Sequence, residues 1–168
     1  TTGRAMTNAG RTRSIGLEAS VAFRPTQALA LRASYGYTDA RFTKYHNGIA
    51  DMEGKKLPYA PRHTLFGGAR YVLPWTFAGV TPSVDVAVHA AGRIYWDDAN
   101  TMEQPFYASL DASVTLQHRL GSLRLFAENI TDTRYNTFYF VSVGHAFYQK
   151  ANPWSIGVSI SVNIGTDE

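Results

Sequence analysis

The stretch FYASLDASVTLQHRL, residues 106–120, alternates apolar and polar side chains along its length. One face carries Phe106, Ala108, Leu110, Ala112, Val114, Leu116 and Leu120. The other face carries Tyr107, Ser109, Asp111, Ser113, Thr115, Gln117 and Arg119. A period of two is typical of a β-strand whose two faces meet different surroundings. The stretch exceeds the roughly 5–6 residues of most soluble strands and the ~9–11 that cross a bilayer at a tilt.

Further segments of the chain show the same alternation. They span residues 13–23, 28–45, 62–74, 80–96, 122–135 and 154–164. In the last of them, Ile156, Val158, Ile160 and Val162 alternate with small residues. No segment of useful length has the periodicity of a helix. We therefore predict an all-β protein of about seven antiparallel strands, each read from its alternation.

The connections between these segments alternate in length. Residues 24–27, 75–79 and 121–122 are short connections, whereas residues 46–61, 97–105 and 136–153 are long ones. Transmembrane β-barrels have tight periplasmic turns and longer extracellular loops in this order. The pattern therefore predicts strands of a transmembrane β-barrel in the outer membrane of a Gram-negative cell.

The charge distribution agrees with a membrane location. Charged residues make up 17% of the 168-residue chain, against about 25% in soluble domains. The lysines, which soluble β proteins use to protect strand edges, lie in predicted loops or, for Lys44, at the loop end of a predicted strand. They are Lys44, Lys55, Lys56 and Lys150. The net charge of +3 is small and scattered, so no nucleic-acid partner is predicted.

The cost of burying charge in lipid decides which face of each strand points outward. An Arg or Lys facing lipid at the bilayer midplane costs about 2–4 kcal/mol. The Val, Ile, Leu and Ala faces are therefore expected to contact outer-membrane lipid. The opposite faces are expected to line the barrel interior, and they carry Glu18, Arg32, Arg70, Asp85, His89, Asp111, Gln117, Arg119, Arg124 and Glu128. Aromatic residues near the strand ends, such as Tyr37, Trp75 and Trp154, suit the two membrane interfaces.

Several motifs resemble the C-terminal part of TonB-dependent outer-membrane receptors. They are NAGRTRSIGLE (residues 8–18), YGYTDARF (35–42), GKKLPYAPRH (54–63) and FAENITDTRY (126–135), followed by Pro153 and Gly157. The last motif is the most diagnostic. It contains the sequon Asn129-Ile130-Thr131, for which we expect a structural role, in a turn or at a strand end, and no glycosylation. The order of the motifs resembles siderophore receptors more than the large glycan importers.

This resemblance implies a plugged barrel of 22 strands. Residues 1–168 are then expected to be its C-terminal third, and the plug domain and TonB-contacting segment are absent from this chain. Seven strands are an odd number, whereas single-chain bacterial barrels close with an even one, which also favours part of a longer protein. The implied partners are the plug, the remaining barrel strands and TonB. The polar tail 165–168 departs from the terminal aromatic residue usual in the family.

The function implied by the resemblance is uptake of a ferric siderophore or similar large nutrient. In this chain the outer loops 46–60, 97–105 and 136–152 are the expected ligand contacts. We predict His46, Tyr59, Trp96, Asp97, Tyr139 and Tyr148 as substrate-binding residues. Residues 138–148 are rich in aromatic rings, and we consider two interpretations for them: the rings contact the ligand, or they pack together beyond the membrane.

Other chemistry finds little support. The acidic residues Asp97, Asp98, Asn100 and Glu103 are compatible with Ca²⁺, but we interpret them as a solvated loop. No catalytic constellation, metal site or cofactor is predicted. The alternative function is a complete small outer-membrane barrel with a structural or adhesion role. It requires an eighth strand, from residues 1–8 or from the loop at 138–149, and neither offers a clean apolar stripe.

Overall fold

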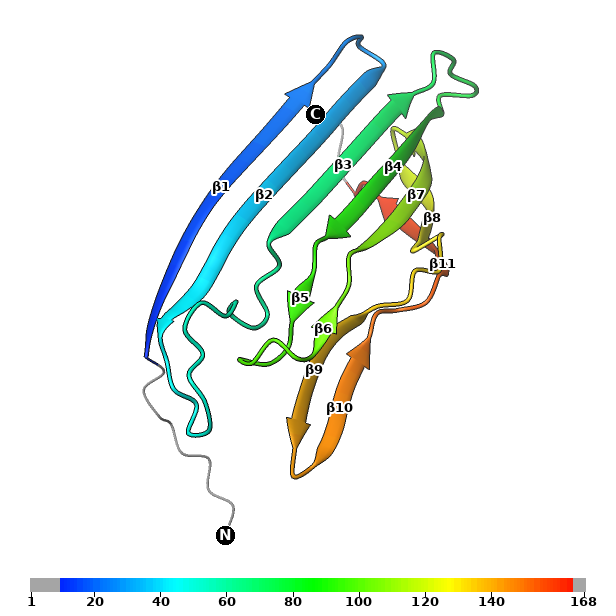
Figure 1. The fold of residues 1–168 in the computed structure, drawn as a ribbon. Helices are drawn as coiled ribbons and strands as arrows, with labels where there is room; N and C mark the ends of the chain where they lie inside the picture. Colours follow the sequence, from blue (N-terminus) through cyan, green and yellow to red (C-terminus); the bar gives the residue numbers. More distant parts are fainter. Residues whose placement is uncertain (1–9, 165–168) are drawn as a thin grey trace.

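The computed structural model describes residues 10–164, which form one large sheet and two small ones. The large sheet has seven antiparallel strands in the order β1-β2-β3-β4-β7-β8-β11 (Figure 1). Their bounds are β1 Arg11–Phe23, β2 Leu29–Lys44, β3 His63–Val72, β4 Thr81–Ala91, β7 Tyr107–His118, β8 Gly121–Glu128 and β11 Ser155–Val162. The predicted meander of seven antiparallel strands is confirmed.

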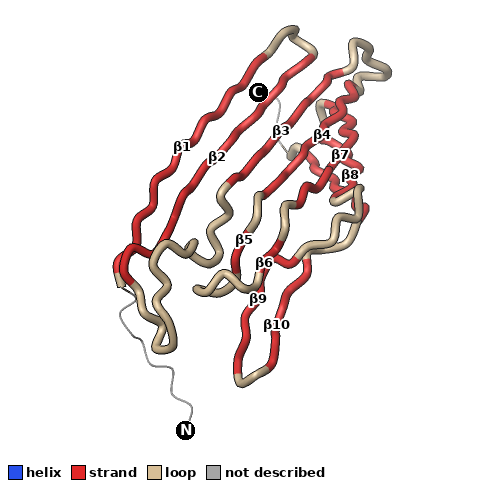
Figure 2. Tube along the Cα trace, viewed as in Figure 1, coloured by secondary structure: helices blue, strands red, loops and turns tan. Residues whose placement is uncertain are grey.

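Two short ribbons lie outside this sheet. β5 (Ile94–Tyr95) pairs with β6 (Glu103–Gln104), and β9 (Asn136–Ser142) pairs with β10 (His145–Lys150). Figure 2 shows that the short turns gather at one end of the sheet and the long loops at the other. The predicted alternation of short and long connections is therefore also confirmed. Within residues 10–164, no helix is long and apolar enough to cross a membrane.

The strand register joins the apolar stripes into one continuous surface. Val158 of β11 is paired with Leu125 of β8, and Leu125 in turn with Val114 of β7. The same row continues through Val84 of β4 to Tyr71 of β3. Because side chains alternate along every strand, the neighbouring rows on this face are also apolar.

Exposure on this sheet is the reverse of that in a soluble protein. Val158 and Val86 on the apolar face are 61% and 40% exposed. Ser83 and Ser113 on the opposite face are only 3% and 5% exposed. A sheet that hides hydroxyl groups and presents valines lowers its free energy only if hydrocarbon covers the valines. The exposed apolar face is therefore the one that the sequence predicts to contact lipid, and we call it the lipid-facing surface.

The polar face carries the charges expected in the barrel interior. Arg70 of β3 stands directly opposite Asp85 of β4 in the register, and it donates a hydrogen bond to Ser83 at 3.3 Å. On the same face, the ring of Phe126 lies over Gly157, where a Cβ would approach the ring to 2.4 Å. This contact explains why a glycine interrupts the side chains of β11.

Two predicted strands are shorter than expected. The predicted strand 80–96 ends at Ala91, and Gly92 and Arg93 separate it from β5, which pairs only with β6. The predicted strand 122–135 ends at Glu128, because Asn129 adopts a left-handed conformation with φ of 49°. In both places the chain leaves the sheet to build the loops beyond it.

The loop at 138–149 does not supply an eighth strand to the large sheet. Its residues form the separate hairpin β9–β10, with a tight turn in which Val143 and Gly144 both have positive φ. This turn is of the type that suits two-residue hairpins. Residues 1–8, the other candidate for an eighth strand, the first two positions of the motif at 8–18 and the polar tail 165–168 lie outside the described residues.

Candidate functional site

A row of aromatic rings connects the three long loops. The ring of Tyr59 lies 5.5 Å from that of Trp96 and stacks on Phe138, also at 5.5 Å. Phe138 in turn contacts Phe140 at 5.6 Å, and Phe140 stacks on Phe147 at 5.0 Å. Residues far apart in the sequence thus form one surface at the long-loop end of the sheet.

Tyr59 is the residue that connects these loops. Its backbone N–H donates to the carbonyl of Tyr95 at 2.9 Å, and its hydroxyl donates to the carbonyl of Tyr139 at 2.8 Å. Its φ of 62° is unusual for a residue other than glycine. The backbone bends at this position, and the ring lies between Trp96 and Phe138.

The two faces of the β9–β10 hairpin differ. Phe140 is paired with Phe147, whereas Tyr139 is paired with Tyr148. Successive residues of a strand point to opposite sides, so the phenylalanines and the tyrosines lie on different faces. The phenylalanine face joins the aromatic row, and the tyrosine face carries the contact of Tyr148 with Lys150, whose ammonium lies 5.6 Å from the ring centre.

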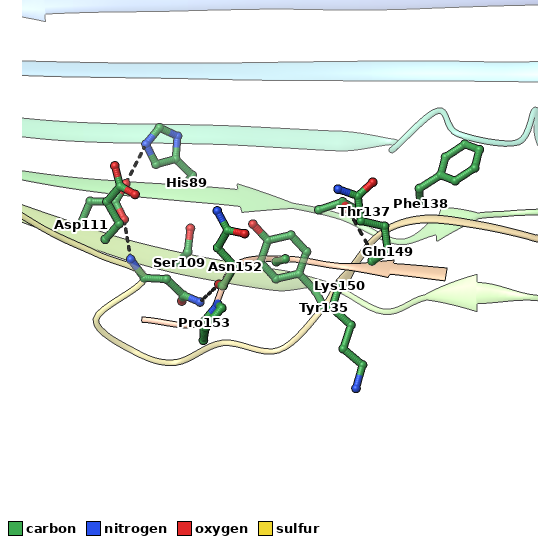
Figure 3. A pocket seen from close by; sticks show the side chains of 13 residues that line it. His89, Ser109, Asp111, Tyr135, Thr137, Phe138, Gln149, Lys150, Asn152 and Pro153 are labelled. Atoms are coloured by element: carbon green, nitrogen blue, oxygen red, sulfur yellow. Dashed lines mark hydrogen bonds and ion pairs between the residues drawn. The ribbon is translucent and has the colours of Figure 1, made fainter. Parts of the chain in front are cut away.

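A hollow of about 780 Å³ lies beside this row, between the end of the sheet and the hairpin (Figure 3). Its lining comes from β4, β7, the end of β8, and the chain on both sides of the hairpin. The lining residues are His89, Ser109, Asp111, Glu128, Asn129, Tyr135, Thr137, Phe138, Gln149, Lys150, Ala151, Asn152 and Pro153. We call this hollow the vestibule. Phe138 belongs both to the vestibule and to the aromatic row.

The turn at Asn129 fixes the shape of the vestibule. Asn129 is 8% exposed, and its amide nitrogen donates to the carbonyls of Thr133 and Asn152 at 3.1 and 3.0 Å. Its amide oxygen accepts from the Thr133 N–H at 2.9 Å. Its own backbone N–H donates to Asp111 at 2.8 Å. One buried side chain therefore links β8 and its following loop to the start of β11, which confirms the structural turn expected there.

The vestibule floor is polar. The Nε2 atom of His89 lies 3.5 Å from a carboxylate oxygen of Asp111. Glu128 adds a second carboxylate, whereas the ammonium of Lys150, another lining residue, lies against the Tyr148 ring on the outer face of the hairpin. Asp111 uses its other oxygen for the Asn129 N–H, so the Asn129 turn holds this carboxylate in place. The arrangement offers carboxylates, an imidazole and amide groups, which suits a large polar ligand with an aromatic part.

The sequence-predicted site residues fall into three groups. Tyr59, Trp96 and Tyr139 come together, the last through its backbone carbonyl. His46 and Asp97 stabilise their own turns: the Nδ1 atom of His46 accepts the N–H of Gly48 at 3.1 Å. Tyr148 lies on the outer face of the hairpin and is exposed. Whether any of the six binds a substrate stays a prediction.

Asp97 organises the short loop before β6. Its carboxylate accepts hydrogen bonds from the N–H groups of Thr101 and Met102 and from the Thr101 hydroxyl, at 2.7 to 3.2 Å. Burial raises the pKa of Asp97, but these hydrogen bonds outweigh it and hold the pKa below its ordinary value. The carboxylate is therefore engaged within its own loop, which agrees with the solvated-loop interpretation of this acidic segment. Among residues 10–164, no three His, Asp or Glu side chains converge as a metal site.

The sequence identified the aromatic loop but not the rings that carry its packing. Phe138, Phe140 and Phe147 make the contacts within the aromatic row, although only Tyr139 and Tyr148 of this loop were predicted as site residues. The signal that distinguishes them is the period of two on each side of Val143-Gly144. Trp96 is 7% exposed, and its indole N–H has no hydrogen-bond partner among the described residues.

The fold and the site together define a class: the wall of a β-barrel with an open hollow at its long-loop end. Comparison with protein families agrees, since residues 1–130 match the model of the TonB dependent receptor-like β-barrel. The chain belongs to this family.

Individual relatives are distant but cover nearly the whole chain. The pesticin receptors of Yersinia pestis and Yersinia enterocolitica are each 23% identical over 160 residues, which is 94% of this chain and 23% of theirs. This chain therefore spans about a quarter of the length of the relatives it matches.

Solved structures support the fold independently. The ferric yersiniabactin uptake receptor FyuA of Yersinia pestis aligns with a TM-score of 0.80 at 21% identity, over 92% of this chain and 24% of its own. The siderophore receptor PiuA of Acinetobacter baumannii aligns with a TM-score of 0.76 at 23% identity, over 92% and 22%. The predicted fold class, an antiparallel segment of a TonB-dependent receptor barrel, is confirmed.

Proposed function

We propose that this chain is part of an outer-membrane receptor that captures a ferric siderophore, or a similar large nutrient, for TonB-dependent uptake. The observation that carries the proposal is the vestibule together with the aromatic row beside it, in which Tyr59, Trp96 and Phe138 bring three connections together. These loops lie at the end of the sheet that faces the cell exterior in membrane barrels. A receptor needs such convergence, because a large ligand is held by several loops at once.

The chemistry of the vestibule suits an organic chelate that brings its own metal ligands. Phe138 is 44% exposed and offers a flat apolar surface beside the polar floor. The carboxylates of Asp111 and Glu128 and the imidazole of His89 provide polar groups on this floor. Relatives described as receptors for ferric yersiniabactin and ferric preacinetobactin support this ligand class.

The rest of the proposed protein follows from the family. In this proposal the chain is the C-terminal third of a plugged barrel of 22 strands in the outer membrane. The plug and the remaining strands complete the lumen against the polar face of the sheet. TonB contacts the protein through its N-terminal part, outside this chain.

The proposal is tested on the full-length receptor, purified in detergent, with ferric yersiniabactin, ferric preacinetobactin and a ferric catecholate as probes. We expect one of these chelates to bind, and Phe138→Ala to weaken its binding about tenfold, the loss typical of a buried aromatic contact. Phe77→Ala is the matched control, because Phe77 is an exposed ring in a short turn at the opposite end. Equal affinities of the wild type and the Phe138 variant would contradict the role of the aromatic row, and no binding of any chelate would contradict the ligand class.

A further inference from the structure

The lipid-facing surface ends in a cluster of charges at the long-loop end of β1 and β2. Along this face the register pairs Leu17 with Tyr37, then Ile15 with Asp39, and then Arg13 with Arg41. The apolar stripe thus passes through a tyrosine to a carboxylate and two arginines within a few residues. All of them point away from the barrel interior, because they continue the odd-numbered stripe of each strand.

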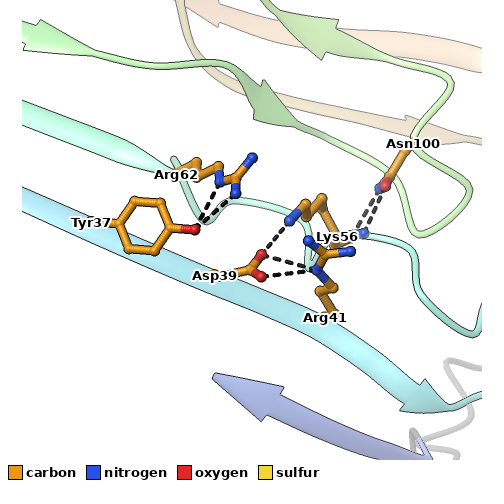
Figure 4. Close-up of polar contacts among 6 residues, drawn as sticks. All are labelled: Tyr37, Asp39, Arg41, Lys56, Arg62 and Asn100. Carbon is orange, nitrogen blue, oxygen red and sulfur yellow. Dashed lines mark hydrogen bonds and ion pairs between the residues drawn. The ribbon is translucent and has the colours of Figure 1, made fainter. Parts of the chain in front are cut away.

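The pairing of Arg13 with Arg41 is electrostatically unfavourable by itself. Like charges directly opposite on neighbouring strands destabilise a sheet. The Nε atom of Arg41 lies 3.0 Å from each carboxylate oxygen of Asp39 (Figure 4). Lys56 forms an ion pair with the same carboxylate. Arg13 makes no ion pair within residues 10–164. One carboxylate therefore compensates two cations, and a third cation stands directly across from them.

The same cluster is held rigidly by the loop beside it. Lys56 is paired with Arg41 as an isolated bridge, and its backbone is fixed on both sides by the Asn100 amide at 2.7 and 2.9 Å. Arg62 donates to the hydroxyl of Tyr37 at 2.8 Å. The cations of this cluster are thus placed by strands and hydrogen bonds, as a preformed binding site requires.

A hollow of about 420 Å³ opens between these groups. It is lined by Arg13, Ile15, Asp39, Arg41, Phe42, Thr43, Glu53 and Gly54. Glu53 adds one negative charge, but Arg13, Arg41 and the adjacent Lys56 and Arg62 keep the cluster net positive. Its inner edge is Ile15, an exposed apolar residue at the start of the lipid-facing stripe.

We propose that Arg13 and Arg41, with Lys56 beside them, bind the phosphate groups of a lipid in the outer leaflet of the membrane. An arginine pair suits a phosphate because guanidinium groups bind its oxygens through paired N–H donors. A lipid matches both parts of the surface: its phosphate meets the arginines, and its acyl chains lie against Ile15, Leu17 and the rows below. A free phosphate would use only the polar part. The site rests on the proposed membrane orientation and is independent of which nutrient the receptor carries.

The test uses the full-length receptor and vesicles of phosphatidylcholine, either alone or with about 10 mol% diphosphoryl lipid A. We expect the receptor to bind lipid A, and each removed arginine to weaken binding about fivefold, the effect of one cation near an anionic membrane surface. Arg13→Gln and Arg41→Gln are measured singly and together. Arg119→Gln, near the end of β7 by the opposite membrane interface, is the control and should bind as the wild type does.

Each outcome decides the proposal. Arg13→Gln leaves the contacts of Asp39, Arg41 and Lys56 intact, so it reports on the site even where the Arg41 variant assembles poorly. Wild-type affinity for lipid A in the Arg13 variant would overturn the proposal. Competition of lipid A binding by inorganic phosphate at equal concentration would overturn the lipid assignment, because it would show that the acyl chains contribute nothing. A receptor that binds lipid A but none of the ferric chelates would refute the proposed ligand class and leave this site supported.

Discussion

The seven-stranded wall and the loops beyond it are held together in different ways. In the wall, β4 and β7 pair continuously from Thr81 to Ala91. The apolar side chains of the wall are exposed and pack against no other layer of the described residues. In the loops, single side chains such as Asn129, Asp97 and Tyr59 carry the connections. The wall therefore depends on its solvent, the lipid, whereas the loops depend on a few polar contacts. Substitutions in the wall should affect membrane assembly, and those in the loops should act locally.

The largest effect is expected for a charge on the lipid face of the wall. Val158→Arg places a guanidinium near the middle of β11 on the exposed apolar face, at a cost of about 2–4 kcal/mol. We expect it to abolish insertion into the outer membrane, measured as the amount of folded, heat-modifiable receptor in membrane fractions. Ser159→Arg, one residue on, points to the interior and should assemble normally. Equal assembly of the two variants would show that β11 has no lipid-facing side.

A smaller, local effect is expected at Asn129. Asn129→Ala removes the side-chain hydrogen bonds and leaves an alanine at φ of 49°, where a Cβ costs roughly 1–2 kcal/mol. We expect residues 130–153 to become sensitive to trypsin at Arg134 and Lys150, while the barrel still assembles. Asn129→Gly keeps the backbone conformation and should be cut more slowly than the alanine variant. Protection of both variants at the wild-type level would mean that this turn does not hold the vestibule.

A still smaller effect is expected when only the hydroxyl of Tyr59 is removed. Tyr59→Phe keeps the stack on Phe138 but loses the 2.8 Å bond to the Tyr139 carbonyl, a contribution of about 1 kcal/mol. We expect hydrogen exchange in β9 to accelerate about fivefold, and exchange in β4 to stay unchanged. Tyr59→Ala removes the ring as well and should accelerate exchange further. Unchanged hydrogen exchange in β9 of both variants would show that Tyr59, in the loop at 46–60, does not stabilise the hairpin.

The smallest effect concerns pH. Since the pKa of Asp97 is held below its ordinary value in the folded loop, its ionised form stabilises the loop at neutral pH. That stabilisation is present above the unfolded pKa of about 3.9 and is lost as pH falls through the folded pKa. A nitroxide label at Asp98→Cys should therefore gain mobility on acidification below about pH 4. With Asp97→Asn in addition, mobility should no longer depend on pH in this range, and a persisting acid transition would assign it to another group.

The sequence predicted the wall well because the wall obeys one rule. Strict alternation, as in Ile156 to Val162, identifies both the strand and its lipid face without any knowledge of its neighbours. The rule does not locate the ends of the strands, which lie at Gly92-Arg93 and at Asn129. The strict alternation stops at these positions, although the predicted segments extend to residues 96 and 135, and the chain leaves the sheet there.

The site was predicted only in part, for a related reason. Tyr59 and Trp96 were expected in the outer loops, and the structure brings them together. That Phe138 stacks on Tyr59 depends on how the hairpin packs across about eighty residues of intervening chain, which local periodicity cannot specify. Periodicity separates Phe140 from Tyr139 but does not tell which of the two faces turns toward the other loops.

The central claim is that β11 and its neighbours present their apolar face to lipid and their polar face to the barrel interior. These 168 residues contain no cysteine, so a nitroxide label on a cysteine introduced at each position from Ser155 to Val162 is unique within them. Any cysteine elsewhere in the intact receptor is first replaced. In a bilayer, the accessibility of these labels to oxygen and to a water-soluble nickel chelate is then measured. The account predicts oxygen maxima at Ile156, Val158, Ile160 and Val162, with nickel accessibility in the opposite phase where water reaches the interior. Oxygen maxima at Ser155, Gly157, Ser159 and Ser161, or no alternation at all, would contradict it.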